Sequence, residues 1–418
     1  MKLVRFRIII LLVFLLLYAP FSSLPIDGAS QGGVIALTAG FGSDPMTTRA
    51  FAWQTVAGGV SSLQYEAGEA NGAFNASHAT EVKANQYVFK SDSGVRYVNK
   101  VSLNGLKPGT YYLYRVSDGN GGFSGVFHFK TEAAETGRFS FLTFSDTQSS
   151  SREQYSAYFA NSLSSALKSF PDAAFILHTG DIVDNGSSEA GQWDFFFGAV
   201  RDILPNTAFE PVIGNHEGQF GGTANFLSHF NLPATHYSFV YGNCLFLVMD
   251  TNSGIQDQMD WLEKTAGANS SVKWKVVALH KGPYGGLHSN DPDCVSLRNE
   301  LPGVFDKCGI DLALEGHDHA YMRSYFLSGG QVVKNPGVNG AYMNPSGTVY
   351  IVTGACGPKT YPVSLRYWTA KNWLPPQARA NEPDEKLFDE IDVAADFLEV
   401  NVYTTDLRKV DYLKISKR

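Results

Sequence analysis

The stretch Gly180-Asp181-Ile182-Val183-Asp184-Asn185-Gly186 follows the apolar run of residues 173–177 and ends it in a turn. A carboxylate at the mouth of a buried strand is costly to desolvate unless a positive group lies against it. Four further predicted strand ends supply side chains that commonly bind metal ions: Asp146, Asn215, His280, and His317 with His319. We therefore predict that Asp181 bridges two metal ions and that the rest of the chain holds them in place.

Predicted strands and helices alternate on both sides of this stretch. Strands are expected at residues 138–145, 173–179 and 209–213, and helices at 152–168 and 192–204. This alternation indicates an α/β domain with parallel strands, in which ligands gather beyond the carboxyl ends of the strands. Asp146, Asp181 and Asn215 each come one or two residues after such a strand.

The later part of the chain contains two predicted hairpins. They comprise residues 236–241 with 244–250, across Gly242-Asn243, and residues 397–404 with 409–415. Between them a helix is expected at 255–266, and strands at 274–279, 310–314 and 348–353. Residues 365–385 are rich in aromatic residues and proline, and the pattern assigns no element to them.

The front part of the chain, residues 33–131, consists of short β-type runs separated by Gly, Asn, Asp and Ser. This pattern favours a small antiparallel β-sandwich, joined by the polar residues 131–137 to the α/β part. Leu-Lys-Pro-Gly-Thr-Tyr-Tyr-Leu-Tyr-Arg-Val, residues 106–116, resembles the turn and following strand of fibronectin type III domains. Its tyrosines are interpreted as core and cross-strand packing rather than as a ligand platform.

Residues 1–30 have the layout of a secretory signal peptide. Lys2, Arg5 and Arg7 precede the apolar run of residues 8–19, and Pro20 and a Ser pair follow it. The run is short for a membrane span, but no clean cleavage site is visible, so an uncleaved N-terminal anchor stays open as the alternative. In both cases we expect a secreted or otherwise extracytoplasmic protein, with membrane contact only through this segment.

The composition of the 418 residues narrows the class of protein further. The net charge is −7 and no basic run lies outside the first residues, which gives no sign of nucleic-acid binding. Four cysteines are compatible with an oxidising compartment. Cys294 and Cys308 would close a short loop if they were oxidised, although the sequence does not choose among the pairings.

The predicted ligands occur in a characteristic order: Asp146, Gly-Asp181, Gly-Asn215-His-Glu, His280 at a strand end, and Gly-His317-Asp-His319. This order resembles the calcineurin-like metallophosphoesterases, and together with the front sandwich it resembles the purple acid phosphatases. The resemblance implies a multidomain fold, in which the sandwich of residues 33–131 precedes an α/β domain over residues 138–418. That second domain is expected to contain two mixed sheets flanked by helices.

The resemblance also assigns roles to individual residues. Asp146, Asp181 and His319 would bind the first metal, and Asp181, Asn215, His280 and His317 the second. The ions would be divalent Fe, Mn or Zn. His216 would contact the phosphoryl group or protonate the departing oxygen. His288 and Tyr284 are looser candidates for substrate contacts.

Two residues depart from the family patterns. Purple acid phosphatases carry a Tyr three residues after the bridging Asp, where its phenolate binds ferric iron and produces the colour, and here Asp184 stands at that position. Many other members of the superfamily use Asp-x-His at the first site, and this chain has Gln148. We infer a colourless site whose first position is weaker, or is completed by water, Gln148 or Asp184.

The function that the resemblance implies is hydrolysis of phosphate esters by a metal-bound hydroxide, which attacks phosphorus in line with the leaving oxygen. Phosphomonoesters are favoured as the substrate. The alternatives are a phosphodiesterase of the same superfamily, and a surface binding module with a degraded metal site. The chain has neither a Gly-x-Ser-x-Gly motif nor a P-loop pattern, so neither of those chemistries competes. The oligomeric state is left open.

Overall fold

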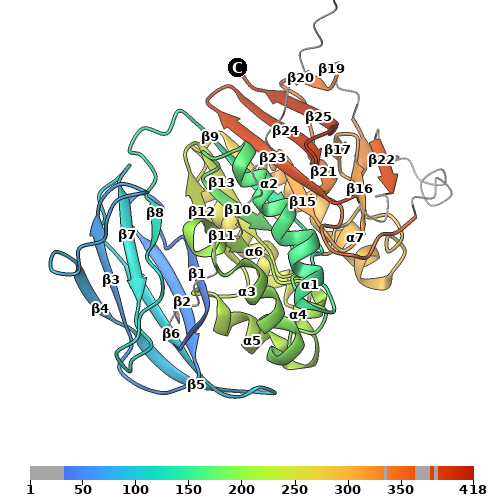
Figure 1. Cartoon of the computed structure of the whole chain (residues 1–418). Coiled ribbons are helices and arrows are strands. Elements are labelled where there is room, and N and C mark those ends of the chain that lie inside the picture. The colour runs from blue at the N-terminus through green and yellow to red at the C-terminus, as the bar shows by residue number, and fades with distance from the viewer. Residues whose placement is uncertain (1–32, 334–336, 363–376, 381–384) are drawn as a thin grey trace, which may run out of the picture.

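The computed structural model describes residues 33–333, 337–362, 377–380 and 385–418. The predicted signal or anchor segment and most of the unassigned stretch 365–385 lie outside these residues. Among the described residues, no helix combines the length and apolar character needed to cross a bilayer. Figure 1 shows a smaller β-sandwich, in blue and cyan, beside a larger part built on two sheets.

The smaller part, called the front sandwich below, contains two antiparallel four-stranded sheets. One has the order β1-β2-β6-β5, with β1 Val34–Gly40, β2 Arg49–Thr55, β5 Asn85–Ser91 and β6 Gly94–Leu103. The other has the order β4-β3-β7-β8, with β3 Ser62–Ala67, β4 Thr80–Lys83, β7 Tyr111–Val116 and β8 Phe127–Lys130. Tyr112 and Tyr114 are buried in its core, and the Tyr112 hydroxyl accepts a hydrogen bond from Lys107 N at 2.9 Å. The predicted packing role of these tyrosines is thus confirmed.

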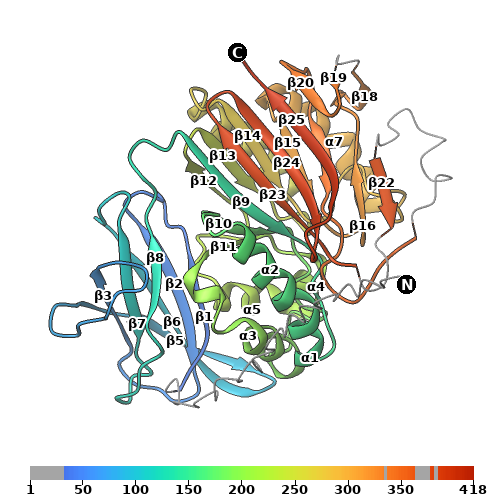
Figure 2. The ribbon, with the colours of Figure 1, turned by 45° about the horizontal axis from the view of Figure 1, so that its top comes forward.

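The larger part packs two mixed sheets face to face (Figure 2). The eight-stranded sheet has the order β11-β10-β9-β23-β24-β25-β20-β19 and contains β9 Arg138–Phe144, β10 Phe175–His178, β11 Ala208–Pro211, β19 Gly337–Val338, β20 Ala341–Met343, β23 Leu387–Ala394, β24 Phe397–Thr404 and β25 Lys409–Ser416. The seven-stranded sheet has the order β12-β13-β14-β15-β21-β16-β22 and contains β12 Tyr237–Tyr241, β13 Cys244–Val248, β14 Trp274–Ala278, β15 Leu312–Glu315, β16 Ala320–Arg323, β21 Val349–Val352 and β22 Gln377–Ala380. A small hairpin pairs β17 Leu327–Ser328 with β18 Gln331–Val332. The predicted fold class is confirmed.

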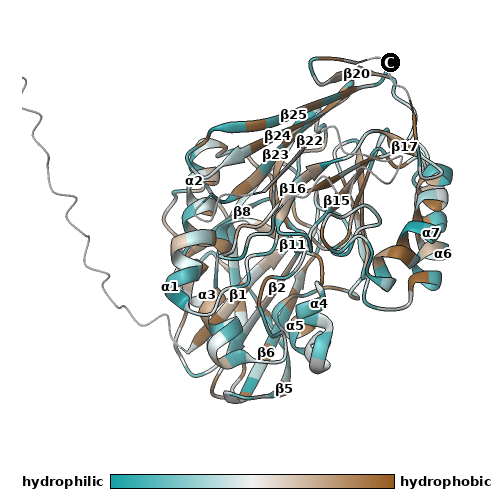
Figure 3. Cartoon of the chain, turned by 90° about the vertical axis from the view of Figure 1, so that its right-hand side faces the viewer, coloured by the Kyte–Doolittle hydropathy of each residue, from teal (hydrophilic) through white to brown (hydrophobic). Residues whose placement is uncertain are grey.

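Helices cover the outer face of each sheet (Figure 3). The first sheet is covered by α1 Arg152–Tyr155, a π-helical turn Ser156–Ala160, α2 Asn161–Ser169, α3 Asp194–Val200 and α5 Gly222–His229. The second is covered by α6 Ile255–Ala268 and α7 Pro292–Cys308. This layering explains why β13 is apolar throughout. Cys244, Phe246 and Val248 face the core between the sheets, whereas Leu245 and Leu247 face the helices.

The strand directions bring the predicted ligands together. β9, β10 and β11 are mutually parallel, and β13, β14, β15 and β21 form a second parallel set. The carboxyl ends of parallel strands lie at one edge of a sheet, so the loops that follow β9, β10, β14 and β15 meet at the end of the paired sheets. Both predicted hairpins are present, as β12 with β13 and β24 with β25.

Two local expectations are corrected by the structure. The helix expected at residues 192–204 is shorter, because α3 ends at Val200 and a separate 3-10 turn containing Pro205 follows at Leu204–Asn206. Cys294 and Cys308 lie at opposite ends of α7, about 21 Å apart along the helix axis. A disulfide requires Cα atoms within about 7 Å, so this pair cannot be bridged, and all four cysteines are free.

The front sandwich is joined to the larger part by buried polar contacts. Tyr114 Oη donates to Pro205 O at 2.7 Å, and Gln54 Nε2 donates to Ser228 Oγ at 3.0 Å. Glu210 on β11 accepts the N–H of Phe41 through Oε1 at 2.6 Å and is only 1% exposed. Burial raises the pKa of this carboxyl to about 8.

Glu210 gives a testable pH dependence. Its pKa in the unfolded chain is the ordinary 4.5, so between pH 4.5 and about 8 the unfolded chain loses a proton that the folded protein keeps. The free energy of unfolding should therefore fall with rising pH, by at most about 1.4 kcal/mol per pH unit from this group. Glu210→Gln removes this contribution, so the melting temperature of the variant minus that of wild type should be more positive at pH 8 than at pH 5, on top of any pH-independent effect of losing the carboxyl near Arg49.

Thermal melts at both pH values measure this difference. Glu135→Gln, at an exposed position in the polar segment 131–137, is the matched control and should leave the pH dependence unchanged. An equal shift for Glu210→Gln at pH 5 and pH 8 contradicts the assignment.

Candidate metal centre

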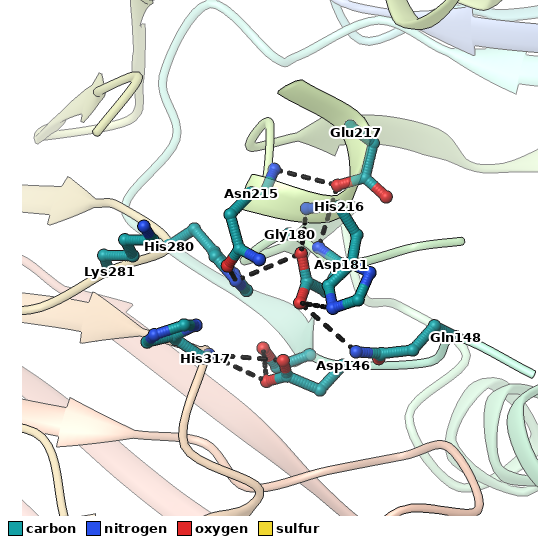
Figure 4. A network of polar contacts seen from close by, with 12 residues as sticks. Asp146, Gln148, Gly180, Asp181, Asn215, His216, Glu217, His280, Lys281 and His317 are labelled. Carbon is teal, nitrogen blue, oxygen red and sulfur yellow. Dashed lines mark hydrogen bonds and ion pairs between the residues drawn. The ribbon is translucent and has the colours of Figure 1, made fainter. Parts of the chain in front are cut away.

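Six side chains that the sequence predicted as ligands meet where the two sheets end. Figure 4 labels each of them except His319. They come from the loops after β9, β10, β14 and β15, and from the start of the short helix α4 Asn215–Gly218, which follows β11. We call them the ligand cluster: Asp146, Asp181, Asn215, His280, His317 and His319. The structure therefore brings all six together, although they span more than 170 positions of the sequence.

Three members of the ligand cluster have a strained backbone. Asp146, Asp181 and His317 have φ angles of 50°, 54° and 72°, in the left-handed region that residues other than glycine seldom adopt. Such strain persists only where the surrounding structure imposes it, and it concentrates at functional sites. Here each strained residue turns the chain directly after a buried strand, which aims its side chain or backbone into the cluster.

The cluster divides into two groups that share Asp181. Asp146, Asp181 and His319 have ligand atoms within 4.8 Å of one another, and so do Asp181, His280 and His317. His280 Nε2 also lies 3.1 Å from Asn215 Oδ1, which places the amide beside the second group. This division is the one predicted for two metal ions bridged by Asp181.

Hydrogen bonds to backbone carbonyls orient two histidines of the ligand cluster. His280 Nδ1 donates to Thr179 O at 2.8 Å, and His319 Nδ1 donates to Lys359 O at 3.2 Å. Because a carbonyl can only accept, these contacts place the proton on Nδ1 and leave Nε2 facing the carboxylates. A backbone partner of this kind fixes the orientation of metal-binding histidines.

The atoms around His280 require a cation. Its Nε2 lies 3.1 Å from Asp181 Oδ1 and 3.1 Å from Asn215 Oδ1, so three atoms that carry lone pairs converge at a buried point. Burial lowers the pKa of His280, but the charge and hydrogen bond of Asp181 outweigh it and raise the pKa to about 9. Burial likewise raises the pKa of Asp181, while His280 and His216 hold it below its usual range. Positive charge between these atoms, from a proton or a metal ion, satisfies the group.

Gln148 and Asp184, the two residues expected to complete the first site, lie in different places. Gln148 Nε2 donates to Asp181 Oδ2 at 3.2 Å and lies 3.4 Å from His319 Nε2. Its Oε1 is buried and has no hydrogen-bond partner among the described residues. The Asp184 side chain is 44% exposed and pairs with Lys359. Gln148 therefore lies beside the first group, and Asp184 lies at its rim.

His216 lies on the open side of the ligand cluster. Its Nδ1 donates to Asp184 O at 2.7 Å, and its Nε2 is 3.7 Å from Asp181 Oδ2. The side chain is 28% exposed. This arrangement fixes the ring and directs Nε2 towards the Asp181 carboxylate that the two groups share.

The structure places the two looser candidates, His288 and Tyr284, in different environments. His288 Nδ1 bonds to Asp291 Oδ2 at 2.8 Å, and its ring centroid is 4.4 Å from that of His317. Tyr284 is buried in the apolar core of the second sheet, with its ring 4.6 Å from Tyr350. Tyr284 is thus a buried core residue, and a substrate contact by its side chain stays a prediction.

Two buried carboxylates that hold the ligand loops were not assigned from the sequence. Glu217 accepts the N–H groups of Asp181, Val183 and Gly214 at 2.9, 2.9 and 2.8 Å. Asp318 accepts the N–H groups of Gly286 and His288. Both belong to quoted motifs, Gly-Asn-His-Glu and Gly-His-Asp-His, but the motifs do not reveal that these side chains point inward. His178 on β10 is fully buried, and its Nε2 lies 3.1 Å from Thr147 Oγ1.

Comparisons with known proteins agree with this geometry. Residues 36–131 match the family profile described as the purple acid phosphatase N-terminal domain, and residues 139–321 match that of the calcineurin-like phosphoesterases. The chain is 25% identical over 292 residues to acid phosphatase type 7 of Homo sapiens, covering 62% of this chain and 64% of that protein. It is 23% identical over 305 residues to probable inactive purple acid phosphatase 27 of Arabidopsis thaliana, covering 62% and 49%. The matched region thus spans less than two thirds of these relatives.

A solved structure shares the fold over most of the chain. Purple acid phosphatase PPD1 from seeds of yellow lupin, Lupinus luteus, superposes with a TM-score of 0.74 at 17% identity. The match covers 92% of this chain and 75% of the lupin chain, so it includes both the front sandwich and the two-sheet part.

Proposed function

Since the chain belongs to the calcineurin-like metallophosphoesterases and carries the N-terminal domain of purple acid phosphatases, we propose that it hydrolyses phosphate esters with two metal ions, outside the cytoplasm. The observation that carries the proposal is the pair of ligand groups that share Asp181. A bridging carboxylate with separate oxygen and nitrogen ligands on each side suits a binuclear hydrolytic site.

The residues present fit two divalent ions. The first ion would be held by Asp146, Asp181 and His319, with Gln148 beside it. The Oε1 atom of Gln148 is buried without a hydrogen-bond partner among the described residues, which suits a neighbouring cation. Asp181, Asn215, His280 and His317 would hold the second. When bound, such ions lower the pKa of water and neutralise charge on phosphoryl oxygens.

The protein side chains supply position and protons. Glu217 fixes the turn that presents Asp181, because its carboxylate accepts the N–H groups of Asp181 and Val183, and it ties this turn to Gly214 before Asn215. His216 presents Nε2 to the open side, where it can donate a proton to a departing oxygen or contact the phosphoryl group. His288, oriented by Asp291, approaches from the second-metal side. No protein nucleophile is needed for direct attack by water.

Phosphomonoesters are the proposed substrate, with diesters as the alternative. The support is the similarity to proteins named as acid phosphatases. Hydrolysis of p-nitrophenyl phosphate and bis-p-nitrophenyl phosphate by the metal-loaded protein separates the two. A higher kcat/KM for the diester overturns the monoesterase proposal and retains the phosphoesterase one.

A second proposed function is a surface binding module with a structural metal site. It is supported by the departures at Gln148 and Asp184, and by the similarity to a relative named as probably inactive. The intact second group and His216 favour an enzyme, since a structural site has no use for a histidine at its open side. Metal-loaded protein that hydrolyses no phosphoester supports the binding module.

We predict that the site is colourless and depends on divalent metal. Asp184 replaces the phenolate that would produce the colour, and its side chain lies at the rim in contact with Lys359. Dialysis against EDTA should abolish hydrolysis, and Mn²⁺, Zn²⁺ or Fe²⁺ should restore it with about two ions per chain by elemental analysis. A visible absorption band, or full activity after complete removal of metal, contradicts the prediction.

The extracytoplasmic location is proposed from residues 1–30. Three basic residues followed by the apolar run 8–19 favour export of the body of the protein. Cell fractionation together with N-terminal sequencing of the purified protein tests whether the segment is cleaved or stays as an anchor.

A further inference from the structure

The segment 357–361 lies against the first-metal side of the site and has no role in the function proposed so far. Gly357 N donates to Asp146 O at 2.8 Å, and a Cβ on this glycine would come within 2.7 Å of the same oxygen. Lys359 O accepts from His319 Nδ1 at 3.2 Å, and Tyr361 N donates to His319 O at 3.0 Å. The backbone of the segment is therefore fixed against two members of the ligand cluster.

Two side chains of this segment face the site. The Tyr361 ring stacks on the His319 ring, with centroids 4.4 Å apart and planes at 18°. The Lys359 ammonium pairs with Asp184 Oδ1, and the same oxygen lies 3.7 Å from His216 Nδ1. Only the Asp184 side chain therefore separates the Lys359 ammonium from His216, which is proposed to contact the reacting phosphoryl group.

The Lys359–Asp184 pair is suited to exchange its partner. Both side chains are nearly half exposed, at 45% and 44%, and such pairs contribute little to folding stability. An ammonium on a flexible stem binds phosphate or carboxylate as a compact charge. An anion on the substrate can therefore replace the Asp184 carboxylate at little cost to the protein.

We propose that Lys359 binds a second anionic group of the substrate, a phosphate or carboxylate separate from the reacting phosphoryl, and that Asp184 holds the ammonium at the rim until this group arrives. The inference rests on the proposed phosphoesterase function and names its substrate class. The site then favours phosphoesters that carry a second negative charge over those whose remaining part is neutral.

The test compares Lys359→Met with wild type on fructose 1,6-bisphosphate and fructose 6-phosphate, by release of inorganic phosphate from the metal-loaded protein. The ratio of kcat/KM for the bisphosphate to that for the monophosphate should fall about fivefold to tenfold, chiefly through KM for the bisphosphate. Lys359→Arg should restore most of the ratio. Lys307→Met is the matched control, because Lys307 forms an exposed pair with Glu263 elsewhere on the surface and its loss should leave the ratio unchanged.

Asp184→Asn separates substrate binding from a structural tether. This variant breaks the same pair but leaves the ammonium free, so the ratio should stay at the wild-type value or rise. An equal fall in Lys359→Met and Asp184→Asn, or an unchanged ratio in Lys359→Met, overturns the proposal. Isothermal titration with the two sugar phosphates measures the same preference as a ratio of binding constants. If the wild-type protein hydrolyses neither compound, the phosphoesterase function is overturned. The ratio of binding constants in Lys359→Met and wild type still decides the role of Lys359.

Discussion

Asp181→Asn should lose essentially all phosphoesterase activity and tight binding of both metal ions. Asp181 is the one side chain common to the two ligand groups, and both of its oxygens are engaged. Oδ1 lies 3.1 Å from His280 Nε2, and Oδ2 accepts from Gln148 Nε2 at 3.2 Å. An amide offers one oxygen and no charge, so it cannot bridge two cations. We expect kcat to fall by roughly a thousandfold or more.

Metal content by elemental analysis, measured together with hydrolysis of p-nitrophenyl phosphate, checks this result. Circular dichroism spectra establish that the variant is folded. Asp202→Asn is the matched control, since Asp202 is exposed beside Arg201, and it should keep two metals and normal turnover. A folded Asp181→Asn protein with two metals and full activity removes the bridging role.

His216→Ala should keep both metals and lose turnover. The ring belongs to neither ligand group, and its Nδ1 is committed to Asp184 O at 2.7 Å, so Nε2 is the atom available to the substrate. Removal of a general acid typically lowers kcat by about 10²- to 10⁴-fold. His236→Ala is the matched control, because the His236 ring packs on Trp261 in another part of the protein.

The dependence on the leaving group identifies what His216 does. A general acid matters most when the departing oxygen is strongly basic, so the loss should be larger for glycerol phosphate than for p-nitrophenyl phosphate. An equal loss with both esters indicates a contact to the phosphoryl group instead. Normal turnover with both esters excludes His216 from the mechanism, and loss of metal assigns it to the metal site.

The sequence predicted the larger elements and the ligand cluster because both leave local signals. The apolar runs before Asp146, Asp181 and His280 are buried strands, and each ends at a polar residue whose chemistry suits a metal. The turn residues Gly242-Asn243 correctly predicted the β12–β13 hairpin. The short motifs follow one another along the chain in the order that is typical of the family, so the resemblance could be recognised from the sequence without any knowledge of contacts.

Contacts between distant segments left no such signal. β23 lies between β9 and β24, and Asp389 pairs in register with Thr143 across some 246 positions of the sequence. The C-terminal hairpin was predicted, but its place at the centre of the eight-stranded sheet was not. The partner of a strand depends on which sheet edges and apolar faces are still exposed when the chain has collapsed. A local sequence pattern does not contain this information.

By itself, the sequence predicted a β-sandwich and an α/β domain from periodicity, and the members of the ligand cluster from polar side chains at strand ends. The two-sheet arrangement and the assignment of ligands to two metals were implied by the family resemblance of the motif order. Only the tertiary structure decided that Gln148 lies inside the site and Asp184 at its rim, that Tyr284 is buried in a core, and that Cys294 and Cys308 are too far apart to bridge. It also brought Lys359 to Asp184, 175 positions away. Which side of a loop a residue faces, and what lies opposite, depends on packing between elements that are remote in the chain.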